Sequence, residues 1–352
     1  MNFLNEDIKK TVRVFPEQGR YGFYRYDMNE NPEGLPKEFV DSVLKEITPE
    51  FLAIYPEENK FLNKYAYYIG AKYENVLATN GSDMAIRYLF ETFGEKGKEV
   101  VTVVPSFEMY WVNCNILGLK HIQVPYQADL SINIDEIIHA INVNTRIVVL
   151  LNPNNPIGNV YTDDEVEKVI IKAESIGAVV IIDEAYHYFY KKTFLGYALS
   201  KNNVIILRTF SKLFSIAACR LGIIISNSEI INYVKKCRLT FDVNAIALKF
   251  GERILDNPKM IDELIRIEIE GKAYVLDELV NSGYECRDCK GNYIFIRTRR
   301  PPNDVADELR KEKKVLVKTF CNDLLKQYIR ISIGSRAIMR IFLDAFFEID
   351  SR

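Results

Sequence analysis

The sequence lacks any long apolar run. Its longest apolar segments, such as 147–151 and 178–182, span only a handful of residues, whereas a membrane-spanning helix needs about 20. The N-terminal stretch MNFLNEDIKKTVRVFP is mixed and charged, without the apolar core of a signal peptide. We therefore expect no contact with a membrane and a soluble, cytoplasmic protein.

The sequence also lacks an excess of charge of either sign. Lys and Arg total 46 and Asp and Glu total 48, which gives a formal net charge of −2. No basic stripe is present, and this argues against nucleic acid as a partner. The 48% hydrophobic and 27% charged fractions are those of a globular protein. The length of 352 residues suits two domains, or one large α/β domain with an appendage.

Metal-binding motifs are missing as well. Six cysteines are present, but only Cys286 and Cys289 form a CxxC pair. A zinc site needs two more ligands, and none of the three histidines has a matching spacing. We expect no metal site, and ordinary reduced thiols.

Strand-like and helix-like patterns alternate between about residues 75 and 226. Apolar strands are predicted at 75–80, 99–105, 145–152, 178–183, 204–211 and 221–226. Helices are predicted at 82–93 and after Thr162, whose spacing to Glu165 is that of a capping box. This alternation predicts an α/β fold with a mainly parallel sheet covered on both faces. Ligands bind such sheets at the carboxyl ends of the strands.

The pattern changes after about Phe241. A long charged helical stretch, 247–281, leads to short strands at 293–298, 314–318 and 328–334. We expect an N-terminal arm (1–30), a large domain with the mostly parallel sheet (31–241) and a smaller C-terminal α+β domain (242–352).

Three polar residues near the ends of predicted strands are candidates for chemistry. Lys212 follows a buried strand, where partial desolvation would lower its pKa and free its amine, although alone it also reads as a surface lysine. Asp183 closes a buried strand and needs a partner or a site. It could hold a protonated ring nitrogen, cap a helix or form a salt bridge. Tyr186 could reach the same ligand.

Two loops could hold further parts of a ligand. Asn155 lies in the loop 152–158, whose prolines and glycine either fix an amide at a ligand or form a plain turn. The segment NGSD (80–83) opens a helix directly after a strand, where backbone N–H groups and the Ser82 hydroxyl suit a phosphate. A plain helix cap is the alternative for this segment. Arg220 could add a charge-assisted phosphate contact.

Eight motifs stand in order along the chain. They are NENP (29–32), YP (55–56), NGSD (80–83), PSFEMY (105–110), NPNNPIG (152–158), DEAY (183–186), TFSK…R (209–220) and RISIG (330–334). In order and spacing the chain resembles the pyridoxal-phosphate aminotransferases of fold type I, and most closely the histidinol-phosphate aminotransferase family. The resemblance covers nearly the whole chain. It implies the fold type I architecture, with a large sheet domain and a smaller C-terminal α+β domain.

The resemblance implies roles for the matched residues. Lys212 would bind pyridoxal 5′-phosphate covalently and move a proton between the substrate Cα and the cofactor C4′. Asp183 would keep the pyridine nitrogen protonated. Asn155 and Tyr186 would bind the 3′ oxygen of the ring, and Phe107 would stack on its face. The residues implied at the phosphate are Gly81, Ser82, Thr209, Ser211 and Arg220.

The resemblance also implies a homodimer and a substrate pocket. Tyr55 would reach the phosphate of the cofactor in the neighbouring subunit. Arg330 would bind a substrate carboxylate or phosphate through its two-pronged guanidinium. Asn31 is expected at the substrate, as is one of three N-terminal tyrosines, of which Tyr21 is our first candidate. The others are Tyr24 and Tyr26, and an aromatic arm packed at the dimer interface is an equal alternative.

Several positions depart from the family pattern. Lys318 stands where the family usually has a second arginine, so the charge is kept but the fork is lost. Met84 replaces a usual glutamate, Ile157 replaces the threonine of NPTG, and the acidic pair after RISIG is missing. These changes concern the substrate and leave the residues implied for the cofactor intact.

We expect a transaminase with histidinol phosphate and 2-oxoglutarate as its substrate pair, which places it in histidine biosynthesis. Three alternatives remain. One is an aminotransferase for another amino acid or for a phosphorylated amine or ketone, such as a sugar-like or triose phosphate. Another is a phospho-amino-acid decarboxylase similar to threonine-phosphate decarboxylase. The third is a cofactor-binding regulator without activity, which an intact Lys212 and the lack of room for a DNA-binding region before NENP disfavour.

Overall fold

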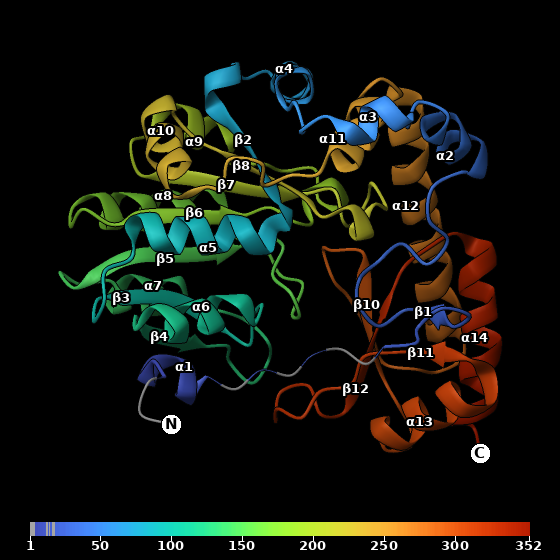
Figure 1. The fold of residues 1–352 in the computed structure, drawn as a ribbon. Helices are drawn as coiled ribbons and strands as arrows, with labels where there is room; N and C mark the ends of the chain where they lie inside the picture. The colour runs from blue at the N-terminus through green and yellow to red at the C-terminus, as the bar shows by residue number, and fades with distance from the viewer. Residues whose placement is uncertain (1–3, 12, 14, 16–17) are drawn as a thin grey trace.

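The computed structural model describes residues 4–11, 13, 15 and 18–352. Two apolar cores organise these residues, and Figure 1 shows the corresponding halves side by side. The larger core surrounds the main sheet, and the smaller core belongs mostly to the C-terminal part of the chain. The long helix α12 (Pro258–Asn281) runs beside the smaller half.

The main sheet of the described chain has seven strands. Six run parallel, and β8 runs antiparallel to both of its neighbours. Every residue of β6 and β7 is buried, so both faces of the sheet are covered, as continuous apolar runs predict. In spatial order the strands are β2 (Val76–Asn80), β8 (Leu221–Ile225), β7 (Val204–Thr209), β6 (Val179–Asp183), β5 (Thr145–Leu151), β3 (Glu99–Val104) and β4 (Lys120–Pro125).

Six of these strands are predicted by the sequence, and β4 is not. Strand β4 lies at an edge, and its segment KHIQVP buries only Val124, so it carries no apolar run. The helix predicted after β2 is α5 (Gly81–Phe93), and the next predicted helix is α8 (Asp163–Glu174). The capping box expected before α8 is confirmed, because Thr162 and Glu165 bond to each other's backbone N–H groups.

Helices cover both faces of the main sheet. Helices α5 and α6 (Met109–Leu117) lie on one face, in front of the sheet in Figure 1. After β4 the chain reverses its direction across the sheet, so right-handed crossovers place α7 (Ile134–Ala140), α8 and α9 (Leu195–Ser200) on the other face. The reversal falls between β3 and β5, and a crevice suited to a ligand forms at their carboxyl ends.

The smaller half is an α+β unit, as the sequence predicts. Its antiparallel sheet has the order β12 (Tyr328–Ser332), β10 (Tyr293–Arg297), β9 (Cys286–Asp288). Helix α12 packs against α14 (Arg336–Asp350), which also packs against α13 (Pro302–Lys313). Within the described ranges, no helix is both long and apolar enough to cross a membrane.

The helical stretch predicted at 247–281 is two helices. Helix α11 (Ala245–Leu255) ends before Asn257, and α12 begins at Pro258, which lacks the N–H needed inside a helix. Helix α11 packs against α4 (Asn59–Tyr68) and contributes to the larger core. The domain limits 1–30, 31–241 and 242–352 stay predictions.

The N-terminal segment joins the two halves. Strand β1 (Tyr24–Arg25) pairs in parallel with β11 (Val315–Leu316) of the smaller half. The segment then turns towards the carboxyl edge of the main sheet. The remaining described elements are α1 (Glu6–Lys10), α2 (Lys37–Leu44), α3 (Pro49–Ala53) and α10 (Ser228–Cys237), with 3₁₀ turns η1 (Tyr73–Asn75), η2 (His187–Phe189) and η3 (Ala217–Cys219).

Candidate active site

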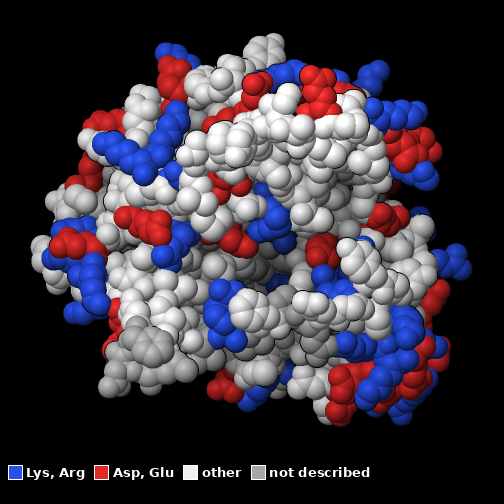
Figure 2. All heavy atoms as spheres, in the orientation of Figure 1, with Lys and Arg blue, Asp and Glu red and all other residues white. Residues whose placement is uncertain are grey.

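The polar motif residues meet at the carboxyl edge of the main sheet. Asp183 is the last residue of β6, Asn155 lies in the loop after β5, and Lys212 follows β7. Figure 2 shows a hollow between the two halves, with Lys and Arg side chains at its rim. Charges of both signs are mixed over the rest of this face. Positive side chains therefore gather at this edge of the sheet, although the whole molecule has a formal net charge of only −2.

Lys212 is partly buried and held in place by the N-terminal segment. Its Nζ donates a hydrogen bond to the carbonyl oxygen of Met28 at 3.1 Å and lies 5.8 Å from the centre of the Tyr186 ring. Burial, with the nearby charge of Arg330, lowers the pKa of Lys212 to about 8. About a tenth of this amine is therefore uncharged at pH 7, in the form that a nucleophile or base requires.

Asp183 is a buried carboxylate, only 2% exposed. The Tyr110 hydroxyl donates to its Oδ2 at 2.8 Å, and the Ala185 N–H donates to its Oδ1 at 3.0 Å. Burial raises the pKa of Asp183 to about 6, and both hydrogen bonds oppose that rise. No basic side chain bonds to Asp183 in the described part of the chain. The carboxylate is therefore open to a positively charged group of a ligand.

A cluster of amide, phenol and guanidinium groups lies beside Lys212. The Tyr186 hydroxyl accepts a hydrogen bond from Nδ2 of Asn29 at 3.0 Å. Arg330 donates from Nη1 to Oδ1 of Asn155 at 2.6 Å and from Nη2 to the carbonyl oxygen of Asp27 at 2.8 Å. Nε of Arg330 and Oδ1 of Asn29 are buried without a partner among the described residues. Buried polar groups normally have partners, so these two mark a place for a polar ligand.

Asn29 is a site residue that the sequence reasoning missed. It is 1% exposed and has a φ of +55°, a left-handed conformation that asparagine tolerates better than most residues. Its amide contacts Tyr186, and its backbone oxygen accepts from Nδ2 of Asn292 at 3.1 Å. Its place as the first residue of NENP is the signal that could have identified it.

An anion cradle lies at the ends of β2 and β7. Thr209 donates from Oγ1 to Oγ of Ser211 at 3.0 Å, and Nη1 of Arg220 lies 3.5 Å from the same Oγ. Gly81 has a φ of +75°, and a Cβ atom there would clash with the guanidinium of Arg220. Glycine at this position therefore lets the guanidinium lie against the start of α5.

The amino end of α5 completes the cradle. Asn80 at the N-cap position makes no side-chain bond to the first turn, so the N–H groups of that turn remain available. Asp83 accepts a hydrogen bond from Nη2 of Arg220 at 3.0 Å, which holds the guanidinium at this helix end. N–H groups, hydroxyls such as that of Ser82, and one guanidinium together suit a phosphate.

Phe107 lies on the third side of the site. It follows β3, and its ring contacts the ring of Tyr110 edge to face, with centroids 5.9 Å apart. Tyr110 therefore touches both Phe107 and Asp183, although the sequence reasoning gave it no role. As the last residue of PSFEMY it could have been singled out.

Four predicted site residues make no hydrogen bond or ring contact with this cluster among the described residues. Tyr55 is 72% exposed and stacks on Phe241 at 4.2 Å. Tyr21 is 96% exposed, and Tyr24 lies in β1. Tyr26 is fully buried in the smaller core and donates to a backbone oxygen of α14. The expectation that Tyr26 could meet a substrate is therefore wrong.

The structure places the two other predicted substrate residues, Asn31 and Lys318, next to different parts of the site. Asn31 donates from Nδ2 to Oγ of Ser215 at 2.8 Å, which ties NENP to the loop after Lys212. Lys318 pairs with Arg330 through two backbone hydrogen bonds, at 3.0 and 2.8 Å. Directly opposite residues of such a pair share one face, so Lys318 can add positive charge beside Arg330.

The site matches the chemistry of the cofactor that the resemblance implies. The cradle of Gly81, Ser211 and Arg220 suits its phosphate, Asp183 suits a ring nitrogen, and Lys212 suits an aldehyde carbon. The open Nε of Arg330 leaves a place for an anionic substrate. The residues present therefore fit pyridoxal phosphate.

The fold and the site together define a group-transfer enzyme of the α/β class, in which a partly buried lysine lies at the same sheet edge as a cradle suited to an anion. A family model described as aminotransferase class I and II matches residues 24–346, and the chain belongs to this family. It is 33% identical to a histidinol-phosphate aminotransferase of Clostridium novyi (strain NT), over 95% of this chain and 93% of that protein. It is 31% identical to the enzyme of the same name from Caldanaerobacter subterraneus subsp. tengcongensis, over 99% of both chains.

Solved structures show the same architecture. A histidinol-phosphate aminotransferase from Sinorhizobium meliloti, solved in complex with pyridoxal-5′-phosphate, has a TM-score of 0.88. The match covers 100% of this chain and 98% of that one at 20% identity. The fold is therefore that of the fold type I aminotransferases, as the sequence predicts.

Proposed function

We propose that this protein is a pyridoxal-phosphate-dependent aminotransferase that acts on histidinol phosphate and 2-oxoglutarate, and so serves histidine biosynthesis. The relatives named histidinol-phosphate aminotransferase, similar over nearly the whole chain, support this assignment. One structural observation carries it. Arg330 is buried beside Lys212 with an unsatisfied Nε, and a guanidinium in that state selects an anionic substrate.

Pyridoxal phosphate, when bound, supplies a ring that accepts electrons from the substrate Cα. Asp183 holds the proton on a ring nitrogen, and burial strengthens this interaction because water cannot screen it. Tyr110 and the Ala185 N–H fix the orientation of the carboxylate. The same two hydrogen bonds favour the ionised form of Asp183, which the ring nitrogen requires.

Lys212 is the proposed acid and base. Its pKa of about 8 lets its Nζ accept the proton from the Cα of the amino donor and later return it. The carbonyl oxygen of Met28 holds Nζ at the sheet edge before substrate enters. Asn155 and Tyr186 orient the ligand through groups that Asn29 and Arg330 already hold.

Arg330 and Lys318 form the proposed anion pocket for the two substrates. A guanidinium suits the carboxylate of the amino-group partner and the phosphate of histidinol phosphate equally well. Lys318, directly across the backbone pair from Arg330 and on the same face, adds positive charge but not a second guanidinium. Of the N-terminal tyrosines, Tyr21 and Tyr24 remain candidates for the substrate, and the role of Asn31 there stays a prediction.

The active form is proposed to be a homodimer. Tyr55, with Phe241 stacked on it, is largely exposed and makes no hydrogen bond to the site residues of its own chain among the described residues. Neighbouring Leu52 and Ile54 are more than half exposed as well, which makes an apolar surface typical of an interface. Across that interface Tyr55 is expected to reach the partner's phosphate. A cytoplasmic location stays a prediction.

The half-reactions test the proposal. Purified protein should show a visible absorption band from the bound cofactor, and Lys212→Ala should remove that band. Lys191→Ala, at an exposed position, is the matched control and should keep it. Glutamate and histidinol phosphate, added separately, should each convert the band to that of the amino form of the cofactor.

The outcomes separate the alternatives. Conversion by glutamate without conversion by histidinol phosphate would make the protein an aminotransferase for another substrate. Release of carbon dioxide from a phosphorylated amino acid would assign it to the decarboxylases. Absence of any band in the wild type would contradict the cofactor assignment itself.

A further inference from the structure

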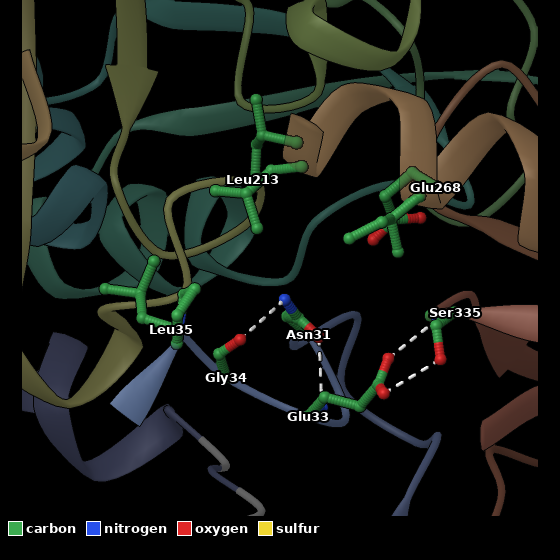
Figure 3. Close-up of a pocket in the computed structure, with 11 residues that line it drawn as sticks. Asn31, Glu33, Gly34, Leu35, Leu213, Glu268 and Ser335 are labelled. Carbon is green, nitrogen blue, oxygen red and sulfur yellow. Dashed lines mark hydrogen bonds between the residues drawn. The ribbon is translucent and has the colours of Figure 1, made fainter. Parts of the chain in front are cut away.

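A second pocket lies between the two halves of the chain. It has a volume of about 280 Å³, near the lower end of the usual range for ligand pockets. The segment 31–36 and Leu213 form one side, and α12 with the turn 334–335 forms the other (Figure 3). Asn31, which is expected at the substrate, lines it, whereas none of the residues proposed to hold the cofactor does. We call it the Glu268 pocket.

Glu268 points from α12 into this pocket (Figure 3). Its side chain is only 7% exposed, and it makes no hydrogen bond or ion pair in the described part of the chain. The ammonium group that acts on Glu268 electrostatically is that of Lys272, one turn further along α12. That group is already bonded to the carbonyl oxygens of Cys289 and Gly291 and to Asp288.

A second carboxylate, that of the exposed residue Glu33, lines the same pocket. Glu33 accepts hydrogen bonds from the N–H and the hydroxyl of Ser335, both at 2.8 Å (Figure 3). Burial raises the pKa of Glu268 well above its ordinary value; Lys272 opposes this rise, and Glu33 adds to it. A buried carboxyl group without a partner is unfavourable, and a cation in the pocket would remove that cost.

The walls of the pocket show which cation fits. Leu35, Pro36, Leu213, Leu264 and Ile267 give it an apolar lining. The described residues contain no group of three or more side chains suited to a metal ion. Two carboxyl groups on an apolar lining match an ion with N–H donors on a small carbon body.

We propose that the Glu268 pocket binds a small organic ammonium ion, which donates N–H groups to Glu268 and Glu33 and packs its carbons against the leucine side chains. This occupant would join α12 to the segment 31–36 and so connect the two halves next to the loop of Lys212. The Glu268 pocket contains none of the proposed cofactor contacts, so binding there does not depend on the proposed transaminase activity.

Calorimetric titration with pyrrolidinium tests the proposal. This secondary ammonium ion has two N–H donors on an apolar ring, and tetrahydrofuran is its neutral counterpart of nearly equal shape. The cofactor-bound wild type should bind pyrrolidinium and not tetrahydrofuran. Binding should release a proton, because the ion favours the ionised form of Glu268. At pH values below the pKa of Glu268, the affinity should therefore rise with increasing pH, by up to tenfold per pH unit.

Two variants of one helix locate the site. Glu268→Gln should weaken pyrrolidinium binding at least tenfold. Glu270→Gln is the matched control, because Glu270 lies on the exposed side of α12 and pairs with Arg266. If Glu268→Gln does not fold, proton release by the wild type, measured in buffers of different ionisation enthalpy, decides the question. Equal binding of tetrahydrofuran, equal affinity of the two variants, or no binding at millimolar concentrations would overturn the proposal.

Discussion

The buried carboxylate of Asp183, which is available to a ligand, destabilises the fold of the cofactor-free protein. Its ordinary pKa is 3.8, and burial raises this to about 6. Between these values the unfolded chain loses its proton first, so stability falls as pH rises, and the loss is complete above the folded pKa. A shift of about two units corresponds to about 3 kcal/mol at most.

Asp183→Asn should therefore stabilise the cofactor-free protein. Because asparagine does not titrate, we expect a gain of about 1–3 kcal/mol at pH 7.5 that shrinks towards pH 4.5. Urea unfolding of the cofactor-free protein across this range measures it. Asp307→Asn, at an exposed position of α13, should show no comparable gain. A variant less stable than wild type at pH 7.5 would contradict the burial argument.

At the scale of elements, a buried ion pair joins the ends of β6 and β7 behind the site. Arg208 donates to Oε2 of Glu184 from Nη2 at 2.9 Å and from Nε at 3.0 Å. Glu184 is fully buried and also accepts from the N–H of Phe194 at 2.7 Å. Since Glu184 follows Asp183 directly, the pair fixes the strand ends that carry Asp183 and lead to Lys212, the proposed catalytic groups.

Glu184→Gln should destabilise the fold by about 3–5 kcal/mol, because it leaves the charge of Arg208 buried without a counter-charge. The free energy of unfolding in urea measures this. Glu263→Gln removes one half of an exposed pair on α12 and should cost under about 1 kcal/mol. Similar losses for the two variants would show that the buried pair is no more important than the exposed one.

The sequence predicts the strands that are buried on both faces, since an apolar run needs no partner to be recognised. It does not predict β4, which has no apolar run and is held in the sheet by its backbone pairing with β3. The site follows the same rule. Lys212, Asp183 and Arg220 stand in local motifs, whereas Tyr110 meets Asp183 across 73 residues and Asn29 meets Tyr186 across 157. Contacts at such separations depend on the tertiary fold.

At the scale of the whole molecule, the apolar surface around Tyr55 should control assembly. Phe241→Glu places a charge against the Tyr55 ring, and we expect the proposed dimer to dissociate in analytical ultracentrifugation. The affinity for pyridoxal phosphate should fall at least tenfold if Tyr55 serves the partner. Val143→Glu, at an exposed position between α7 and β5, should leave the dimer intact. A dimer that survives Phe241→Glu would place the interface elsewhere.

The pairing of β1 with β11 has a consequence for how the protein is made. A ribosome releases residue 24 early, but its partner at residue 315 emerges only when most of the chain has been translated. Until then the segment before Met28 lacks its strand partner, and the contacts of Asn29 with Tyr186 and of Asn31 with Ser215 are what can hold the Met28 carbonyl oxygen near Lys212. The main sheet can form during translation, while the surroundings of Lys212 are completed only near the end. A nascent chain would thus form the main sheet before the site at the edge of that sheet is complete.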